Sequence, residues 1–573
     1  MAHNQNTSDL FRSLDTLWQA QLGKLTLGVS PASILSAQSA WFAHMMQAPG
    51  KILELVTYPA FNGRENYARL WTDTPYGAPP SSPTPDEDPR FKSENWKLWP
   101  WRLFKHHFLI AQEWLSLATN DVPGLDDESE RIISFATRQF MDAICPANFP
   151  ATNPDLAFET LVSKGENLIN GAKNAVTDLH HLLTGSPPKG NRHFKVGRNL
   201  AITPGEVVFQ NSLIELIKYT PQTETVYPEP LLITPAWIMK YYILDLSPHN
   251  SLVKWLVEKG YTVFMISWKN PGKEDAQLSM DDYQNLGIVA ALNEIEALCP
   301  HTKIHLAGYC LGGTLAMITA ATLALKGDQR LKSLTLLAAQ GDFSHAGELM
   351  LFVNPSEVAF LKNMMRVQGY LDTRQMAGAF QMLRSYDLIW SKIINDYFHG
   401  LRRGDVDLMT WNLDATRMPY TMHSQYLERL YLKNEFSAGH YTVEGKAVAP
   451  ENIQVPVFAV GADKDHVAPW QSVYKIHLMV NTEITFVLAK GGHNAGIVSE
   501  PGHKGRFYRQ HVRKPSEPYL DASEWFEKAE RHKDSWWLAW HAWLAQHSTS
   551  QKVPPPICPN PLRPAPGLYV LQR

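Results

Sequence analysis

Cysteine is scarce in this sequence, long apolar runs are missing, and neither sign of charge is in large excess. Four of the 573 residues are cysteines, and they show no CxxC or metal-like spacing, which argues against a disulfide framework and against a zinc site. Lys and Arg number 53 against 56 Asp and Glu, so no basic face for nucleic acid is expected. The longest apolar stretch, 315–325, is about half of the roughly 20 residues that a transmembrane helix needs.

The first residues, 1–9, are polar and lack the basic start and apolar run of a secretory signal. With the scattered cysteines, this pattern predicts a cytoplasmic protein without a transmembrane segment. No metal and no tightly held organic cofactor are expected.

The chain divides into two parts with different patterns. Residues 1–190 predict a mainly helical N-terminal domain, because apolar residues there recur at helical spacing. Residues 191–573 predict an α/β catalytic domain, in which strand-like and helix-like segments alternate regularly from residue 231 onward. This alternation stops at about 345–440, where mostly helical sequence predicts a cap inserted over the active edge of the sheet. The expected architecture is an α/β-hydrolase fold with a helical cap.

The strongest local signal is Gly308-Tyr309-Cys310-Leu311-Gly312, between a strand-like and a helix-like segment. It has the form of a nucleophile elbow with cysteine in place of serine. The flanking glycines fit because a Cβ there would collide with backbone in so tight a turn. Cys310 is therefore the candidate nucleophile, and the amide of Leu311 is a candidate oxyanion donor.

Such a nucleophile needs an acid and then a histidine, each after a later strand. The loop after the strand VPVFAVG contains Asp465, the preferred acid, with Asp463 as the alternative. The strand ITFVLAK leads into a glycine-rich loop with His493, the candidate base. His466, next to Asp465, is a candidate for substrate binding.

Four further positions are weaker candidates. The amide of Ile243 is a candidate second oxyanion donor, since the loop after the third strand usually supplies one. Asp245 either caps a helix or contacts a substrate hydroxyl. Trp411 and Met409 either line the enclosure over the nucleophile or pack within the cap.

A group of tryptophans near the C-terminus allows two interpretations. Trp536, Trp537, Trp540 and Trp543 recur at roughly helical intervals after Trp525. A helix docked on the catalytic domain is favoured over a contact with a membrane or granule surface.

The motifs resemble those of the polyhydroxyalkanoate synthases, which polymerise 3-hydroxyacyl-CoA into storage polyester. The resemblance spans most of the chain and includes WIMKYYILDLSPHNSLVKWL, GYCLGGT, MTWNLDATRMP, DKDHVAPW and GGHNAGIV. It implies Cys310 as nucleophile, Asp465 as acid and His493 as base, the same assignment that the spacing gives. The GYCLGG form and the chain length resemble the single-subunit, short-chain class (class I). The segment DFSHAGEL (342–349) departs from the family pattern, which has a further acidic residue there.

The resemblance also implies the reaction and its partners. (R)-3-hydroxyacyl-CoA, with 3-hydroxybutyryl-CoA as the expected monomer, would be polymerised through an acyl-cysteine with release of CoA. The nascent polyester, a second copy of the chain in a homodimer and the surface of a storage granule are the implied partners. Two alternatives stay open: a cysteine-dependent hydrolase, either thioesterase or polyester depolymerase, and a granule scaffold without catalysis.

Overall fold

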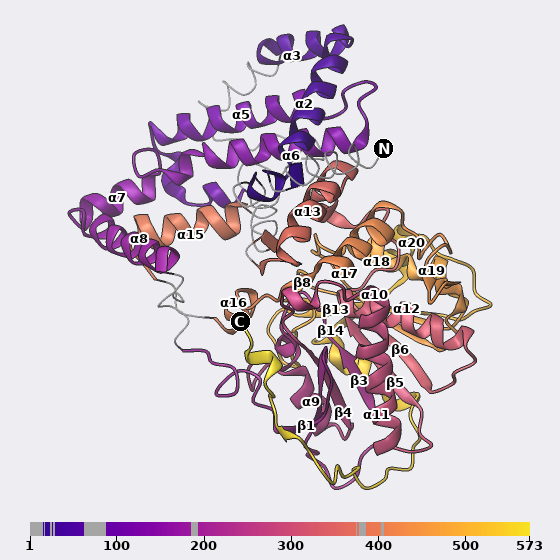
Figure 1. The fold of residues 1–573 in the computed structure, drawn as a ribbon. Helices are drawn as coiled ribbons and strands as arrows, with labels where there is room; N and C mark the ends of the chain where they lie inside the picture. The colour runs from indigo at the N-terminus through magenta and orange to yellow at the C-terminus, as the bar shows by residue number, and fades with distance from the viewer. Residues whose placement is uncertain are drawn as a thin grey trace, which may run out of the picture. The chain divides into compact units, whose positions relative to one another are not determined.

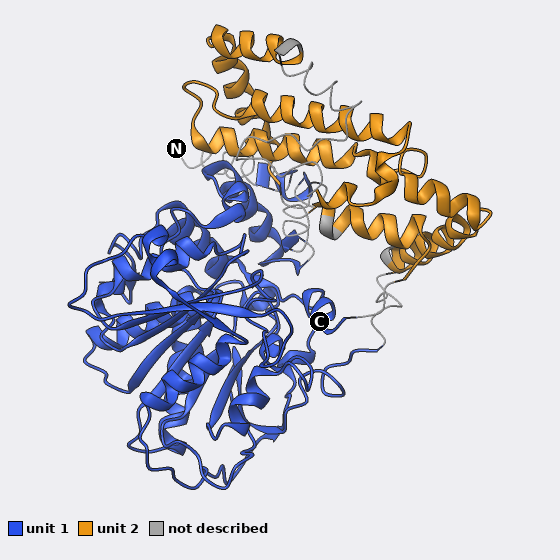
Figure 2. Cartoon of the chain, turned by 180° about the vertical axis from the view of Figure 1, so that it is seen from behind, with its two compact units in different colours: residues 1–28, 192–377, 405–573 blue, residues 29–191, 378–404 orange. Residues whose placement is uncertain are grey.

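The computed structural model describes residues 15–16, 18–22, 26, 29–61, 88–184, 193–373, 375–376, 385–402 and 406–573. Figure 2 shows two compact units. The helical unit comprises residues 29–191 and 378–404, and the α/β unit comprises residues 1–28, 192–377 and 405–573. The expected domain boundary near residue 190 falls outside the described residues.

Two helices of the helical unit begin at polar side chains that cap them. Asp126 accepts a hydrogen bond from the Ser129 amide at the start of one helix, and Asn153 caps another through the Asp155 amide. The helices are α2 (Pro31–Met46), α3 (Pro49–Phe61), α5 (Trp101–Thr119), α6 (Asp127–Ala143), α7 (Pro154–Val162), α8 (Glu166–Thr184), η9 (Tyr386–Trp390), α15 (Ser391–Ile393) and η10 (Ile394–Phe398).

The α/β unit is organised around one large mixed sheet. The described strands run in the order β14-β13-β12-β11-β6-β5-β3-β4-β2-β1-β15. Their bounds are β1 (Gly205–Gln210), β2 (Ile214–Tyr219), β3 (Leu231–Thr234), β4 (Val263–Trp268), β5 (Ile304–Tyr309), β6 (Leu331–Leu337), β11 (Val457–Ala462), β12 (Ile484–Ala489), β13 (Phe507–Arg513), β14 (Glu530–Lys533) and β15 (Arg563–Pro564).

The centre of this sheet is parallel and its two sides are antiparallel. Strands β4, β3, β5, β6, β11 and β12 pair in parallel, and all their residues except one are buried. Continuous apolar runs such as VFMISW fit strands that are covered on both faces. Figure 1 shows helices such as α11 and α12 alongside these strands. The carboxyl ends of the parallel strands thus meet at one edge, from which the loops discussed below emerge.

Helices and short hairpins surround this sheet. The helices are η5 (Tyr241–Asp245), α9 (Leu252–Glu258), α10 (Met280–Asp282), η7 (Tyr283–Val289), α11 (Ala290–Leu298), α12 (Leu311–Leu325), α18 (Trp470–Tyr474), α19 (Ile476–Met479), α20 (Ala522–Lys528), α21 (Trp536–Gln546) and η13 (Tyr569–Leu571). The segment expected to form the cap contributes η8 (Gly347–Phe352), α13 (Pro355–Gln368), α16 (Asp407–Asn412), α17 (Tyr420–Gln425) and η11 (Tyr426–Leu432), with the short strands β7 (Tyr370–Leu371) and β8 (Met418–Pro419). Strands β9 (Thr442–Val443) and β10 (Lys446–Ala447) form a further hairpin.

The tryptophans near the C-terminus lie in the core of the α/β unit. Trp536, Trp537, Trp540 and Trp543 of α21 are at most 5% exposed, as is Trp525 of α20. Large aromatic side chains that are this deeply buried contribute strongly to the stability of the fold. The interpretation as a docked helix is therefore confirmed, and these side chains offer no surface to a membrane or granule.

Three buried histidines predict that the α/β unit loses stability in acid. Burial lowers the pKa of His305 to about 4 and the pKa values of His423 and His477 to about 3. Between pH 6.5 and about 4 the unfolded chain binds protons that the folded chain does not, so the free energy of unfolding falls as pH falls. Each histidine contributes up to about 1.4 kcal/mol per pH unit in this window.

Urea unfolding at pH 7.5, 6.0 and 5.0 measures this slope. We expect His477→Phe to reduce the slope of the unfolding free energy against pH by an amount that corresponds to about one bound proton. The substitution keeps an aromatic ring at this position and removes the titrating group. The exposed His440→Gln serves as the control and should leave the slope unchanged. An unaltered slope in His477→Phe would contradict the assignment.

Candidate active site

Cys310 lies at the corner between strand β5 and helix α12. Its backbone has φ 52° and ψ −124°, a conformation that costs a non-glycine residue about 1–3 kcal/mol. The corner is held by hydrogen bonds from the Cys310 amide to the Leu337 carbonyl at 2.8 Å and from the Gly313 amide to the Cys310 carbonyl at 2.9 Å. The strained pose and the position before a helix are those expected of a nucleophile elbow.

The glycines around Cys310 are required by close backbone contacts. A Cβ on Gly308 would lie 2.4 Å from the Cα of Gly313, and a Cβ on Gly312 would lie 2.2 Å from the Thr234 carbonyl oxygen. A Cβ on Gly313 would lie 2.3 Å from the Cβ of Ala339. The elbow therefore packs against the neighbouring strands so closely that no side chain fits at these three positions.

Replacing Gly312 by alanine is expected to lower the free energy of unfolding by about 2–3 kcal/mol, as for overpacked cores. The new methyl group would meet the rigid backbone of Thr234, which cannot rotate away. Urea unfolding followed by tryptophan fluorescence measures the change. Gly50→Ala, where a Cβ would have no neighbour within 4 Å, is the control and should cost little. Wild-type stability in Gly312→Ala would contradict the packing argument.

His493 and Asp465 form a hydrogen-bonded pair. The Nδ1 atom of His493 lies 2.7 Å from Oδ2 of Asp465, whose side chain is fully buried. The other oxygen of Asp465 accepts hydrogen bonds from the amides of Val467 and Ala468 at 2.9 and 2.8 Å. The carboxylate is thus fixed from both sides, and it directs the Nε2 atom of His493 away from itself.

The pKa of His493 is affected by both Asp465 and Cys310. Burial lowers the pKa of His493, but the charges of Asp465 and Cys310 and hydrogen bonds to both raise it on balance well above its ordinary value. The imidazole is therefore hydrogen-bonded to the carboxylate, and the sulfur of Cys310 is close enough to interact with it electrostatically. The protonated ring is stabilised in this position, which is the property that a proton acceptor for a thiol needs.

The alternative acid, Asp463, holds the backbone instead of the imidazole. Its carboxylate accepts a hydrogen bond from the Gly491 amide at 2.7 Å, and the Lys464 amide donates to the Gly491 carbonyl at 2.9 Å. These contacts tie the acid loop to residues 491–497, which we call the histidine loop. Asp465 is the carboxylate that contacts His493, and Asp463 holds the histidine loop in position.

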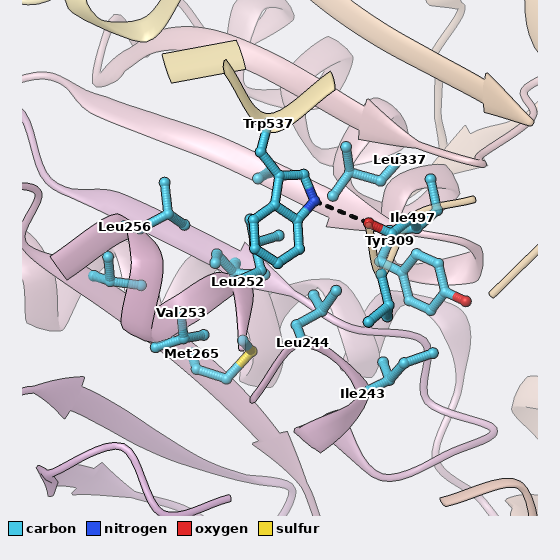
Figure 3. Close-up of a cluster of buried hydrophobic side chains, with 14 of the residues drawn as sticks. Ile243, Leu244, Leu252, Val253, Leu256, Met265, Tyr309, Leu337, Ile497 and Trp537 are labelled. Atoms are coloured by element: carbon cyan, nitrogen blue, oxygen red, sulfur yellow. Dashed lines mark hydrogen bonds between the residues drawn. The ribbon is translucent and has the colours of Figure 1, made fainter. Parts of the chain in front are cut away.

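The C-terminal helix α21 also holds the histidine loop. The indole nitrogen of Trp536 donates to the Gly496 carbonyl and that of Trp537 donates to the Ile497 carbonyl, each at 3.0 Å. Figure 3 shows the second of these bonds within the cluster of buried side chains that also contains Tyr309. Sequence reasoning predicted the docking of this helix but not its contact with the loop.

The predicted oxyanion donors belong to two helices, α12 and η5. Leu311 is the first residue of α12, and the first amides of a helix have no acceptor within the helix. Ile243 lies in η5, and its side chain is buried in the cluster that Cys310 packs against. In Figure 3 it lies near the ring of Tyr309. The roles of the two amides stay predictions.

Asp245 is buried in a polar pocket of its own. Its Oδ1 accepts hydrogen bonds from the hydroxyls of Thr203 and Ser251, and burial raises its pKa. Helix α9 is capped by Ser251, which accepts from the Lys254 amide at 3.0 Å, so Asp245 supports the cap residue without capping the helix itself. Its second oxygen has no hydrogen-bond partner among the described residues.

The remaining candidates differ in exposure. Trp411 is buried, belongs to the same cluster as Ile243 and donates to the Lys240 carbonyl at 2.7 Å, whereas Met409 is 55% exposed. His466 is half-buried beside Asp465, and its carbonyl accepts from the Glu348 amide at 3.0 Å. Their part in substrate binding stays a prediction.

Two sets of neighbours were missed by sequence reasoning. The hydroxyl of Tyr309 donates to Asn494 Oδ1 at 2.7 Å, and the Tyr309 ring lies 5.7 Å from that of His493. Adjacency to Cys310 and His493 in the two motifs was the signal for both. The second set is Tyr426 and Tyr431 of η11: burial raises their pKa values, and the charge of Cys310 raises them further, so both side chains lie within electrostatic range of the sulfur. No sequence pattern pointed to these two residues.

Within the described residues, no cluster of three or more His, Cys, Asp or Glu side chains has the form of a metal site. Among them there is also no helix with the length and apolarity of a membrane span. The chemistry that the site offers is that of a cysteine beside a carboxylate-bound imidazole: attack on an acyl group and proton transfer.

The comparisons with known proteins agree with this architecture. Residues 229–500 match the family model for the alpha/beta hydrolase fold, so this fold is confirmed. Residues 87–256 match the N-terminus of poly-beta-hydroxybutyrate polymerase (PhaC), and residues 9–51 match a second N-terminal model of that polymerase. Among solved structures, a monoacylglycerol lipase from Paleococcus ferrophilus is 14% identical with a TM-score of 0.33, covering 58% of this chain and 99% of the lipase.

Relatives of known name extend over most of the chain. It is 38% identical to the poly(3-hydroxyalkanoate) polymerase of Methylorubrum extorquens, covering 88% of this chain and 85% of the relative. It is 34% identical to the PhaC subunit of the Cupriavidus necator polymerase, covering 88% and 86%. The chain belongs to the poly(3-hydroxyalkanoate) polymerase family.

Proposed function

We propose that this chain is an acyltransferase that polymerises (R)-3-hydroxyacyl-CoA, with 3-hydroxybutyryl-CoA as the expected monomer, into polyester and releases CoA. The names of its relatives support the reaction class. The observation that carries the proposal is the Asp465–His493 pair at 2.7 Å, together with the electrostatic interaction of Cys310 with the same imidazole. Cys310, His493 and Asp465 are the proposed catalytic triad.

In the first step, Nε2 of His493 accepts the proton of the Cys310 thiol. The thiolate attacks the thioester carbonyl, and the amides of Leu311 and Ile243 are the proposed donors to the oxyanion. The C–S bond to CoA breaks, CoA leaves as its thiol with the proton from His493, and the acyl group remains on Cys310. Asp465 stabilises the imidazolium while it holds the proton.

In the second step, the hydroxyl of a bound monomer or of the growing chain gives its proton to His493. Its oxygen attacks the acyl-cysteine, the C–S bond breaks, and the proton returns to the sulfur. One ester bond is formed for each CoA released. Cysteine suits these two reaction steps because exchange between two thioesters is nearly isoenergetic, so the acyl group stays activated until the acceptor arrives.

One assay separates this function from its alternatives. Purified protein is incubated with 3-hydroxybutyryl-CoA while CoA release and product size are followed. Polymer formation is the expected result. Release of CoA with free 3-hydroxybutyrate as the sole product would identify a hydrolase, and no release of CoA would leave only a scaffold role.

A homodimer and a location in the cytoplasm at the granule surface are further parts of the proposal. The family resemblance implies both, and exposed apolar side chains on helices α2 and α3 of the helical unit suit contact with a hydrophobic polyester: Phe42, Met46, Leu53 and Val56. Co-sedimentation with polyester granules tests the location, and analytical ultracentrifugation tests the oligomeric state.

A further inference from the structure

We propose that a basic pocket at the end of strand β12 binds phosphate groups. The pocket has a volume of about 560 Å³, within the range of small-ligand sites. The residues that matter to the argument line its walls: Lys490, Arg506, Phe507, Arg531, Lys533 and Asp534.

The charges in the basic pocket favour an anion. Four permanent cations face one carboxylate, and no ion pair among the described residues neutralises any of the four. The carboxylate of Asp534 is already engaged, because its Oδ1 accepts hydrogen bonds from the Gly502 and Ser535 amides at 2.7 Å each. Arginine and lysine side chains are the usual partners of phosphate oxygens.

Three of the four cations are held in place before any ligand binds. The guanidinium of Arg531 lies 3.9 Å from the centre of the Phe507 ring, and the ammonium of Lys490 lies 5.1 Å from it. Arg506 donates from Nη1 to the Lys490 carbonyl at 2.7 Å. Less side-chain freedom is lost on binding when cations are already ordered, which favours affinity.

The basic pocket is adjacent to the histidine loop. Lys490 directly precedes Gly491, and a Cβ on Gly491 would lie 2.9 Å from Nη1 of Arg506. His493 follows two residues later, so its Cα lies within about 7.6 Å of that of Gly491 by chain length alone. A ligand in the pocket is thus at the same edge of the sheet as the proposed catalytic histidine.

Two sources can supply phosphate to this position. One is the phosphorylated adenosine end of CoA, an assignment that rests on the proposed function. The other is a free phosphate compound, which does not depend on that function. The chemistry of recognition is the same, and the experiment below distinguishes the two.

The test uses the double variant Arg531→Gln with Lys533→Gln. Both side chains are exposed on the edge strand β14, so the variant is expected to fold. The control, Lys259→Gln with Lys552→Gln, removes the same charge from exposed positions near Gly260, before the start of β4. Calorimetric titration of the full chain with pyrophosphate and with adenosine 3′,5′-bisphosphate at low salt measures binding without turnover.

We expect both ligands to bind the wild-type chain and the control, and to bind the double variant about tenfold more weakly or worse. A matching rise in KM for acyl-CoA with kcat unchanged would identify CoA as the source. Weaker pyrophosphate binding with an unchanged KM would support the phosphate pocket and assign it to free phosphates. Absence of binding to the wild type, or equal binding to the double variant, would overturn the proposal, whereas failure of the proposed function would show separately as absence of CoA release.

Discussion

Replacing Cys310 by alanine is expected to lower the rate of CoA release from 3-hydroxybutyryl-CoA by about 10⁴-fold or more, because removal of a nucleophile leaves only binding and oxyanion stabilisation. The fold should survive, since alanine is smaller and the elbow is held by glycine contacts and backbone hydrogen bonds. Steady-state CoA release measures the rate, and circular dichroism measures the fold.

The control for this variant is Cys558→Ala, which removes another free, partly exposed thiol. It should keep wild-type activity. Mass spectrometry of the wild-type chain after brief mixing with substrate should find an acyl group on the peptide that contains Cys310. Retained activity in Cys310→Ala, or an acyl group on a different cysteine, would refute the nucleophile.

Replacing His493 by glutamine is expected to lower the rate by about 10²–10⁴-fold, the usual contribution of a general acid–base group. The same imidazole serves acylation and ester formation, so both acyl-cysteine formation and chain growth should slow. Rapid-quench measurement of acyl-cysteine formation and steady-state measurement of CoA release report on the two steps.

A histidine outside the site provides the comparison. His249→Gln changes an exposed residue and should leave both steps unchanged. A loss of less than about tenfold in His493→Gln would be too small for a proton acceptor that works in both steps.

The presence of a parallel sheet followed from the alternation of apolar runs and helical segments, because strands buried on both faces have a distinctive composition. The order of its strands is known only from the structure. The antiparallel sides did not follow as easily. Strand β13 contains arginines, a histidine and a glutamine and has only one buried residue. Its sequence FYRQHVR therefore shows neither the alternation of a half-buried strand nor the periodicity of an amphipathic helix. Strand β13 is held beside β12 by hydrogen bonds between the two backbones. Because these bonds do not involve side chains, the sequence of the strand gives little indication of them.

The same contrast holds for the candidate site. Cys310, Asp465 and His493 were found from motif order, since each follows a strand that ends at the same edge of the sheet. Tyr426 and Tyr431 interact electrostatically with the sulfur from a segment more than 100 residues away, and only the folded chain brings them within range. Contacts of this kind depend on tertiary packing, which local sequence patterns do not encode.

The hydrogen bonds from α21 to the histidine loop have a consequence for biosynthesis. The loop carbonyls of Gly496 and Ile497 find their indole donors only 40 residues later in the chain. Because domains begin to fold while the ribosome is still adding residues, a nascent chain that has passed His493 still lacks this support. The enzyme should therefore remain inactive on the ribosome until α21 has been made.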